Sequence, residues 1–320
     1  MLATTLIGMG LLVSQAFAQE RQFPSKPIRI VVGFSPGGAT DLVARIVGEG
    51  LRERLRESVL VDNKPGAGTD IAVDIVLKSP PDGHTLMLVF ATNASRAALK
   101  RLPDPTASMT PIAQISDSPL MLVVNNSLPV HNINDLVKYA RANSGKLSYA
   151  VTAVGGPAHL IGELFNSRAG TNILAIPYKG SSQALSDLLG GIVHMRWDSV
   201  GSSLPLARSG KLRAIAVAEL ARSPLAPDIP TVAESGQSDF YAPSFYGIAG
   251  PRAMATDLVN RLNADLQAVV KLPSTLQQMN KVGVSPVTGS PDDLARILKF
   301  NYDLWSKVVR DSKIEFQGDN

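Results

Sequence analysis

The residues best placed to do chemistry in this chain of 320 residues are glycines at the starts of helices. Residues 31–41, VVGFSPGGATD, run from an apolar strand through a Pro-Gly-Gly turn into an amphipathic helix. The first N–H groups of a helix have no partner within it and carry a partial positive charge. Such a turn suits a carboxylate or a phosphate, although Gly-rich turns also arise in α/β proteins for geometric reasons alone.

Three more turns place glycines between a strand and a helix. They lie at 65–69 (PGAGT), 153–159 (AVGGPAH) and 179–182 (KGSS). Pro157 suits the first turn of a helix, and Lys179 adds a cation beside two hydroxyls. The turn at 65–69 has an equally good structural explanation. Because open α/β sheets bind ligands at the carboxyl ends of their strands, these turns predict a cleft between two α/β units for a ligand with one or more carboxylates.

Three other polar side chains are candidates for function. Asp198 follows the strand at 193–197, where we expect it either to accept a hydrogen bond from a ligand or to cap the next helix. His159 and Glu163 have the i, i+4 spacing of metal ligands on a helix, but no third ligand is identifiable. We therefore expect no metal and no cofactor, and we interpret His159 as a residue of the helix start.

Common catalytic signatures are absent from the sequence. It contains no Gly-x-Ser-x-Gly elbow, no Walker A motif, no Gly-x-Gly-x-x-Gly after a strand and no cysteine. The net charge of +4 is spread along the chain, so nothing indicates nucleic-acid binding. We expect a binding protein and not an enzyme. The alternative is an exported α/β hydrolase that uses Asp198 with His159 or His194.

The elements that must position these turns alternate between strand and helix. With 45% hydrophobic residues, this pattern predicts α/β units with parallel sheets. Strands are expected at 27–34, 58–62 and 84–90 in the first unit, and at 147–153, 173–178, 193–198 and 212–218 in the second. The closing helices at 256–270, 274–282 and 291–310 should pack back on the first unit. The first domain is then discontinuous, 19–124 and 244–320, the second is 125–243, and the crossings lie near 123–126 and 242–246.

The N-terminus has the pattern of a secretory signal peptide. Residues 2–13 form an apolar run that is short for a membrane span, and Ala16 and Ala18 provide the small residues that signal peptidase reads. The polar residues 19–22 follow at once, which disfavours a buried N-terminal helix. We expect cleavage after Ala18, removal of residues 1–18, and a mature protein outside the cytoplasm.

Many short blocks between Phe23 and about Ile314 resemble the Bug-type extracytoplasmic solute receptors, the substrate-binding proteins of tripartite tricarboxylate transporters. The blocks are 23–28 (FPSKPI), 36–41 (PGGATD), 62–68 (DNKPGAG), 81–86 (PDGHTL), 159–165 (HLIGELF), 176–181 (IPYKGS), 188–191 (LLGG), 210–214 (GKLRA) and 228–234 (DIPTVAE). The resemblance implies a two-domain α/β fold of the type II periplasmic-binding-protein (Venus flytrap) class. It also implies a periplasmic monomer that closes over a small di- or tricarboxylate or an aromatic acid, for uptake or sensing. A membrane permease of such a transporter is the candidate partner.

Members of this family hold the carboxylate mainly through backbone amides and ordered water at the first strand-to-helix turn. The resemblance therefore assigns the ligand to this turn and to the facing turns of the second domain. The expected ligand-binding residues are Phe34, Ser35, Gly37, Gly38, Thr40, Asp41, Thr92, Asn93, Thr152, Gly155, Gly156, His159, Lys179, Gly180 and Asp198.

Two departures from the family pattern touch the expected cavity. This chain has Pro157 where the family commonly has a hydroxyl residue, and the loop expected at 91–95 (ATNAS) is shorter than usual. Fewer hydroxyls favour a more apolar or aromatic acid. Because no arginine lies in the expected turns and Lys179 is their only cation, we expect the N–H groups around 35–40 to provide most of the affinity.

Overall fold

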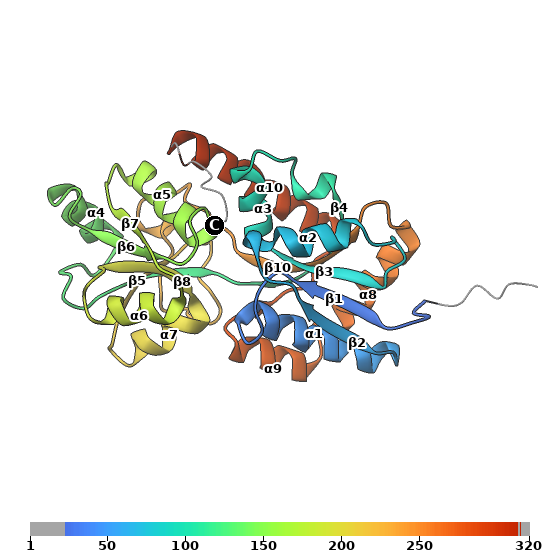
Figure 1. The fold of residues 1–320 in the computed structure, drawn as a ribbon. Coiled ribbons are helices and arrows are strands. Elements are labelled where there is room, and N and C mark those ends of the chain that lie inside the picture. The colour runs from blue at the N-terminus through green and yellow to red at the C-terminus, as the bar shows by residue number, and fades with distance from the viewer. Residues whose placement is uncertain (1–22, 313, 315–320) are drawn as a thin grey trace, which may run out of the picture.

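The computed structural model describes residues 23–312 and residue 314. The expected signal peptide at 1–18 lies outside the described residues. The described chain forms two α/β units side by side, each built around one sheet (Figure 1). Within this part of the chain, no helix combines the length and the apolar character that crossing a bilayer requires.

The sheet of the first unit has six strands in the order β11-β4-β10-β3-β1-β2. β1 is parallel to β2 and β3, and β10 is antiparallel to β3 and β4. Val31, Val32 and Leu88 have no exposed surface, as expected for apolar strands covered on both faces. The strands are β1 (Ile28–Val32), β2 (Val59–Asn63), β3 (Thr85–Phe90), β4 (Met109–Asp117), β10 (Phe245–Pro251) and β11 (Ser285–Pro286).

Helices cover both faces of this sheet. α1, α8 and α9 bury their apolar sides on one face, and α2, α3 and α10 lie on the other (Figure 1). In α1, the apolar side consists of Val43, Val47 and Leu51 at helical spacing. The helices are α1 (Ala39–Leu55), α2 (Asp70–Leu77), α3 (Ala91–Leu99), α8 (Thr256–Val270), α9 (Pro273–Lys281) and α10 (Pro291–Asp311).

The sheet of the second unit has five strands in the order β7-β6-β8-β5-β9. β6 is parallel to β7 and β8, so the carboxyl ends of these three strands lie at one edge of the sheet. α4 and α5 cover one face, and α6 and α7 cover the other. The elements are β5 (Leu120–Val124), α4 (Ile133–Ala142), β6 (Ser148–Val151), α5 (Pro157–Ala169), β7 (Leu174–Pro177), α6 (Ser181–Leu189), β8 (Met195–Ser199), α7 (Val200–Arg208) and β9 (Arg213–Val217).

The chain first changes sheets earlier than the sequence predicts. β4 ends at Asp117 in the first sheet, and β5 starts at Leu120 in the second. Residues 120–124 fall within the range 19–124 that we expected for the first domain, but they form β5 between β8 and β9, where their apolar side chains fill the centre of the second sheet. The crossing therefore lies at 118–119 and not near 123–126.

Residues 91–99 form a helix, α3, where the sequence suggested a loop at 91–95. Asn93 Oδ1 accepts the backbone N–H of Phe90 at 3.0 Å and so stabilises the helix start. The alanines that follow have a high helix propensity, and they are buried. The interpretation as a loop was wrong because it gave no weight to these alanines.

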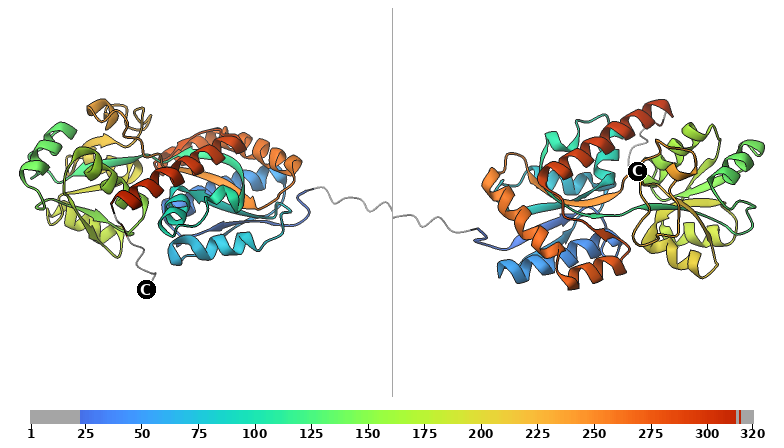
Figure 2. Two further views of the ribbon diagram at one scale, coloured as in Figure 1. Left: turned by 90° about the horizontal axis from the view of Figure 1, so that it is seen from above. Right: turned by 180° about the vertical axis from the view of Figure 1, so that it is seen from behind.

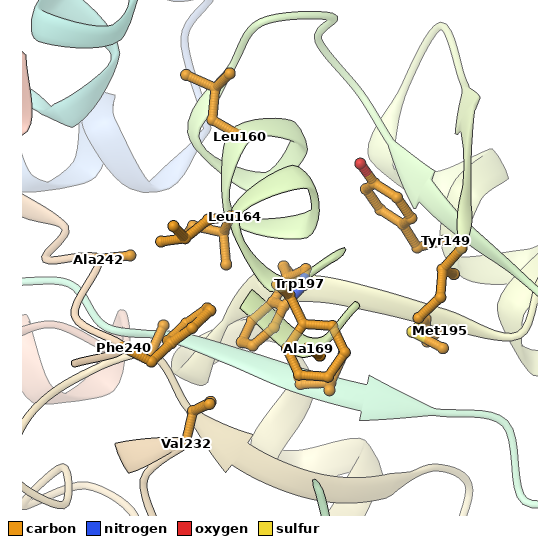
Figure 3. Packing of buried hydrophobic residues seen from close by; sticks show 14 of the residues in the cluster. Tyr149, Leu160, Leu164, Ala169, Met195, Trp197, Val232, Phe240 and Ala242 are labelled. Atoms are coloured by element: carbon orange, nitrogen blue, oxygen red, sulfur yellow. The ribbon is translucent and has the colours of Figure 1, made fainter. Parts of the chain in front are cut away.

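Aromatic rings form the centre of the second unit's larger core (Figure 3). Trp197 of β8 stacks on Phe240 with ring centroids 5.8 Å apart, and Phe165 of α5 lies near both rings. Phe240 and Ala242 come from the segment that returns to the first unit. This segment therefore belongs to the second unit as far as Ala242.

The last helix, α10, joins both units (Figure 2). Leu294 and Leu298, near its start, belong to the core of the first unit. Trp305 and Val309, near its end, belong to the core of the second. We expected all three closing helices to pack on the first unit. α8 and α9 do so, but only the first half of α10 does, because this helix of 21 residues extends past the first sheet.

The units also touch through two glycines. A Cβ built on Gly201, in α7, would lie 2.6 Å from the Cα of Gly283, in the turn after α9. Real Cβ atoms essentially never come within 3.0 Å of another heavy atom outside their own neighbours. The contact therefore leaves no room for a side chain at position 201.

We expect Gly201→Ala to lower the free energy of unfolding by about 1–3 kcal/mol, because one backbone must move away from the other. Gly48→Ala is the matched control, since its Cβ would lie at an ordinary 3.5 Å from Val59. This control, inside α1, should gain about 0.5–1 kcal/mol. Urea unfolding measures both changes, and wild-type stability of Gly201→Ala would contradict the contact.

Candidate functional site

Two helix starts, one in each unit, have the same backbone geometry. At the start of α1, Gly37 has a φ of +91°, and Gly38 has a φ of −81° and a ψ of 169°. At the start of α5, Gly155 has a φ of +74°, and Gly156 has a φ of −76° and a ψ of 168°. The first glycine of each pair needs the left-handed region that favours glycine. The second has a conformation open to any residue.

In both turns, the N–H of the first glycine is bonded to a side chain four residues later. Gly37 donates to Asp41 Oδ2 at 2.9 Å, and Gly155 donates to His159 Nδ1 at 2.9 Å. Neither helix has a side-chain cap at its N-terminus. The N–H groups of 38–41 in α1, and of Ala158 and His159 in α5, therefore remain available for an anion.

Asp41 organises the first turn. Its buried carboxylate also accepts hydrogen bonds from Arg45 Nε at 2.9 Å and Asn63 Nδ2 at 3.0 Å. Burial alone would raise the pKa of Asp41, but the hydrogen bonds outweigh burial and hold the pKa below its usual value. The oxygens of Asp41 are thus engaged in fixing the shape of the turn.

His159 is buried, and its ring is fixed by the second turn. Because Nδ1 accepts the N–H of Gly155, the neutral ring carries its proton on Nε2. Burial lowers the pKa of His159, against a smaller opposite effect of the Glu163 carboxylate. Glu163 accepts a hydrogen bond from the Tyr149 hydroxyl at 2.7 Å. Among residues 23–312, no group of three or more His, Cys, Asp or Glu side chains is arranged to hold a metal ion.

A buried arginine of β8, Arg196, reaches the turn before α6, and the sequence did not lead us to expect it there. Lys179 is exposed, and Gly180 is the extended residue before the helix. Arg196 of β8 donates from Nη1 to the backbone oxygen of Ser181 at 3.3 Å and from Nη2 to Ser181 Oγ at 2.5 Å. The expectation that Lys179 is the only cation at these turns was wrong, because an arginine from a neighbouring strand reaches the turn. A charged residue inside an apolar strand was the available signal.

Asp198 is held by residues of its own unit. Its Oδ1 lies 3.2 Å from Arg196 Nη2, and its Oδ2 accepts the hydroxyl of Ser203 at 2.7 Å. The cap of α7 is Ser199, which accepts the N–H of Ser202, so the interpretation of Asp198 as the helix cap was wrong. No hydrogen bond in the described part of the chain joins Asp198 to a histidine.

An exposed ring next to the first turn begins a row of aromatic side chains. Phe34 is 40% exposed, and its ring centroid lies 5.1 Å from that of Phe90. The Phe90 ring lies 6.1 Å from that of Tyr246, whose hydroxyl is 3.4 Å from Thr40 Oγ1. Ser35 is exposed in the same turn. The row places an apolar surface beside the free N–H groups of α1.

The turn at 66–69 fits the structural explanation. Arg96 Nη2 donates to the backbone oxygen of Ala67 at 2.7 Å. A Cβ on Gly68 would lie 2.4 Å from the Arg96 guanidinium. Gly68 has a φ of +59°, in the left-handed region that favours glycine, and its missing side chain leaves room for the Arg96 guanidinium of the same unit.

The remaining expected residues occupy different surroundings. Asn93 is buried in α3, where its Nδ2 donates to Thr69 Oγ1 at 3.2 Å, so it supports the turn at 66–69. Thr92 is half-buried at the start of the same helix. Thr152 is exposed directly after β6, at the sheet edge from which the α5 turn projects.

A comparison with known proteins assigns the chain to a family. Residues 43–314 match the family described as the tripartite tricarboxylate transporter family receptor. The chain belongs to this receptor family. Protein BugT of Bordetella pertussis is 33% identical to this receptor over 294 residues, which cover 91% of the receptor and 90% of BugT.

Solved structures agree with this assignment. The periplasmic binding protein BugD has a TM-score of 0.77 and 33% identity to the receptor, with coverage of 92% of the receptor and 100% of BugD. An R. palustris protein solved with adipate has a TM-score of 0.78 and 34% identity, with coverage of 92% and 99%. The family and the two-domain periplasmic-binding-protein fold expected from the sequence are thus confirmed.

The two glycines of the first turn should differ in their tolerance of substitution. Gly37→Ala puts an L side chain at a φ of +91°, which should cost about 1–3 kcal/mol of stability. Gly38→Ala is the matched control, because its φ is −81° and nothing lies within 4 Å of the added Cβ. Its unfolding free energy should stay within about 0.5 kcal/mol of wild type. Equal costs in urea unfolding would contradict the described turn.

The His159 ring should titrate below its ordinary pKa of 6.5 and keep its proton on Nε2 when neutral. The folded state then binds fewer protons here than the unfolded state, so this group's contribution to stability falls as the pH drops below 6.5. Ring ¹⁵N and ¹H shifts measure both properties, with His159→Gln to assign the signals. A neutral ring protonated on Nδ1 would show that the bond from Gly155 does not form.

Proposed function

We propose that this receptor captures a small carboxylate between its two α/β units in the periplasm. The observation that carries the proposal is the pair of uncapped helix starts, Gly37-Gly38 in the first unit and Gly155-Gly156 in the second. Each offers N–H donors at the positive end of a helix dipole, and together they meet more of the acceptor sites of a carboxylate than either does alone. The adipate in the related R. palustris structure supports the same ligand class.

The first turn is proposed as the main anchor. It keeps free N–H groups at 38–41, whereas Pro157 removes one donor from the second turn. The Phe34 ring beside the first turn would cover an apolar part of the ligand. A dicarboxylate with an apolar chain, or an aromatic acid, therefore suits the site better than a heavily hydroxylated acid.

We propose binding without catalysis. A hydrolase would need Asp198 to orient a histidine, but its carboxylate is engaged by Arg196 and Ser203. His159 uses Nδ1 to accept the N–H of Gly155. Closure of the units over the ligand would exclude water and strengthen the hydrogen bonds to the carboxylate. A membrane permease is the proposed partner of the loaded receptor.

The proposal is tested by a thermal-shift screen of mono-, di- and tricarboxylates and aromatic acids, with adipate included, followed by calorimetry. A ligand at a hundred times its dissociation constant should stabilise the receptor by about 2.7 kcal/mol. Gly38→Val should fold, because its φ of −81° and the open space around it admit the side chain. Its side chain covers the free N–H groups, so we expect affinity to fall by more than about a hundredfold.

Lys179→Ala is the matched comparison, because it removes an exposed cation from the facing unit. It should weaken binding by less than about tenfold, the usual range of an exposed charge. If Gly38→Val bound the ligand normally and Lys179→Ala did not bind it, an ion pair with Lys179, and not the backbone N–H groups, would account for the affinity. Failure of every carboxylate to stabilise the receptor would reject the ligand class.

A further inference from the structure

The segments that connect the two units lie next to one another, and three backbone hydrogen bonds join them. Ser118 donates to the oxygen of Ser244 at 2.7 Å, Ala218 donates to the oxygen of Leu120 at 2.9 Å, and Ala242 donates to the oxygen of Ala218 at 3.0 Å. We define the hinge as residues 117–120, 218–219 and 241–245. Any change in the angle between the units must bend the chain at its two crossings, 118–119 and 243–244, which these bonds hold next to 218–219.

Each joining segment brings one carboxyl group to the hinge. Asp117 ends β4, immediately before the first crossing, and Glu219 follows β9 at the start of the return. The Glu219 carboxyl lies near the backbone N–H of Ser244, directly before β10, and this N–H lowers its pKa against the effect of burial. Glu219 Oε1 is buried and has no hydrogen-bond partner among the described residues. Asp117 Oδ1 accepts a hydrogen bond from Gln114 Nε2 at 2.8 Å.

The titratable groups that face one another here are all acidic. Burial, and then the neighbouring Asp117, raise the pKa of Glu219 to about 8. Burial also raises the pKa of Asp117 despite the bond from Gln114. Tyr241, on the return segment, has a pKa raised to about 12 by burial and by both carboxyls.

Two basic side chains on neighbouring parts of the chain are paired with other carboxylates. Arg222, on the return segment, is paired with Glu234 at 3.1 Å. Arg296 of α10 lines a cavity together with Gln114 and Tyr241, but it is paired with Asp293 of its own helix. In the described part of the chain, no ion pair joins Asp117 or Glu219 to a basic side chain.

We propose that Glu219 and Asp117 form a proton-dependent latch at the hinge. While Glu219 is protonated, the pair carries at most one charge, and the joining segments keep the hydrogen bonds described above. Loss of that proton puts two negative charges at the place where the segments meet. Their repulsion loosens the hinge and changes the distribution of angles between the units.

The sign of the pH dependence follows from the raised pKa of Glu219. The latched hinge holds a proton that an ordinary, solvated glutamate would release near 4.5, so latching is favoured at low pH and weakens as the pH rises through about 8. If a glutamate with such a pKa lay in the core of one unit, its ionisation would change only the folding stability of that unit. At the hinge, its ionisation acts on the relative position of the units.

Single-molecule fluorescence transfer between the units tests the latch. The chain has no cysteine, so Lys78→Cys on the first unit and Ser209→Cys on the second provide two exposed and unique labelling sites in the full chain. Between pH 6.5 and pH 8, the ratio of the two distance populations should shift by up to about tenfold per pH unit, the limit for one coupled proton, and it should level off above about pH 8. The same labelled chain with Glu219→Gln should show a distribution that does not change with pH.

Glu53→Gln, an exposed change on α1, is the matched control and should respond to pH like the wild-type hinge. Asp117→Asn removes the neighbouring charge and should move the transition to lower pH, which gives a second test if Glu219→Gln folds poorly. A wild-type distribution that is constant from pH 6.5 to 9 would overturn the latch. An unchanged pH response in Glu219→Gln, or in Asp117→Asn, would also overturn it.

Discussion

The candidate site depends on one hydrogen bond that occurs twice, from the N–H of the first glycine of a Gly-Gly turn to a side chain four residues later. This bond closes the turn from inside, through Asp41 in one unit and His159 in the other. A serine or threonine cap would stabilise each helix by about 1 kcal/mol, but it would also take the N–H groups that an anion needs. Both helices lack such a cap. Each start is therefore less stable by itself than it would be with an anion bound.

The two acceptors give the turns different electrostatic characters. Asp41 brings a negative charge close to the start of α1, and Arg45 and Asn63 offset it by donating to the same carboxylate. His159 is neutral because burial lowers its pKa, so the second turn needs no counter-charge. A buried cation of the second unit, Arg196, lies instead at the turn before α6, where it contacts both Ser181 and Asp198. The side chain that closes each turn is thus either neutral, as in His159, or a charge that is already paired, as in Asp41.

Local patterns predicted the architecture, because alternating apolar segments and Gly-rich turns are signals that a few neighbouring residues carry. The strand at 120–124 shows the limit of this reasoning. Its apolar run suits the centre of either sheet, and only its pairing with β8 and β9 decides the matter. Arg196 was missed for a related reason, since its partner Ser181 lies on another element. Asp117 and Glu219 are about a hundred residues apart in the sequence, and no spacing rule connects them.

The contacts between the units restrict how the hinge can move. Gly201 meets Gly283 on one side, where a side chain on either residue would collide with backbone. Elsewhere, a Cβ on Gly155 would lie 2.3 Å from Leu99 Cδ2, so the turn before α5 touches α3 of the first unit. The end of α10 also packs into the core of the second unit. A sliding motion would break all of these contacts at once, whereas bending at the joining segments can keep some of them. Because Gly155 belongs both to the turn before α5 and to the contact between the units, we expect the shape of that turn to depend on the angle between the units.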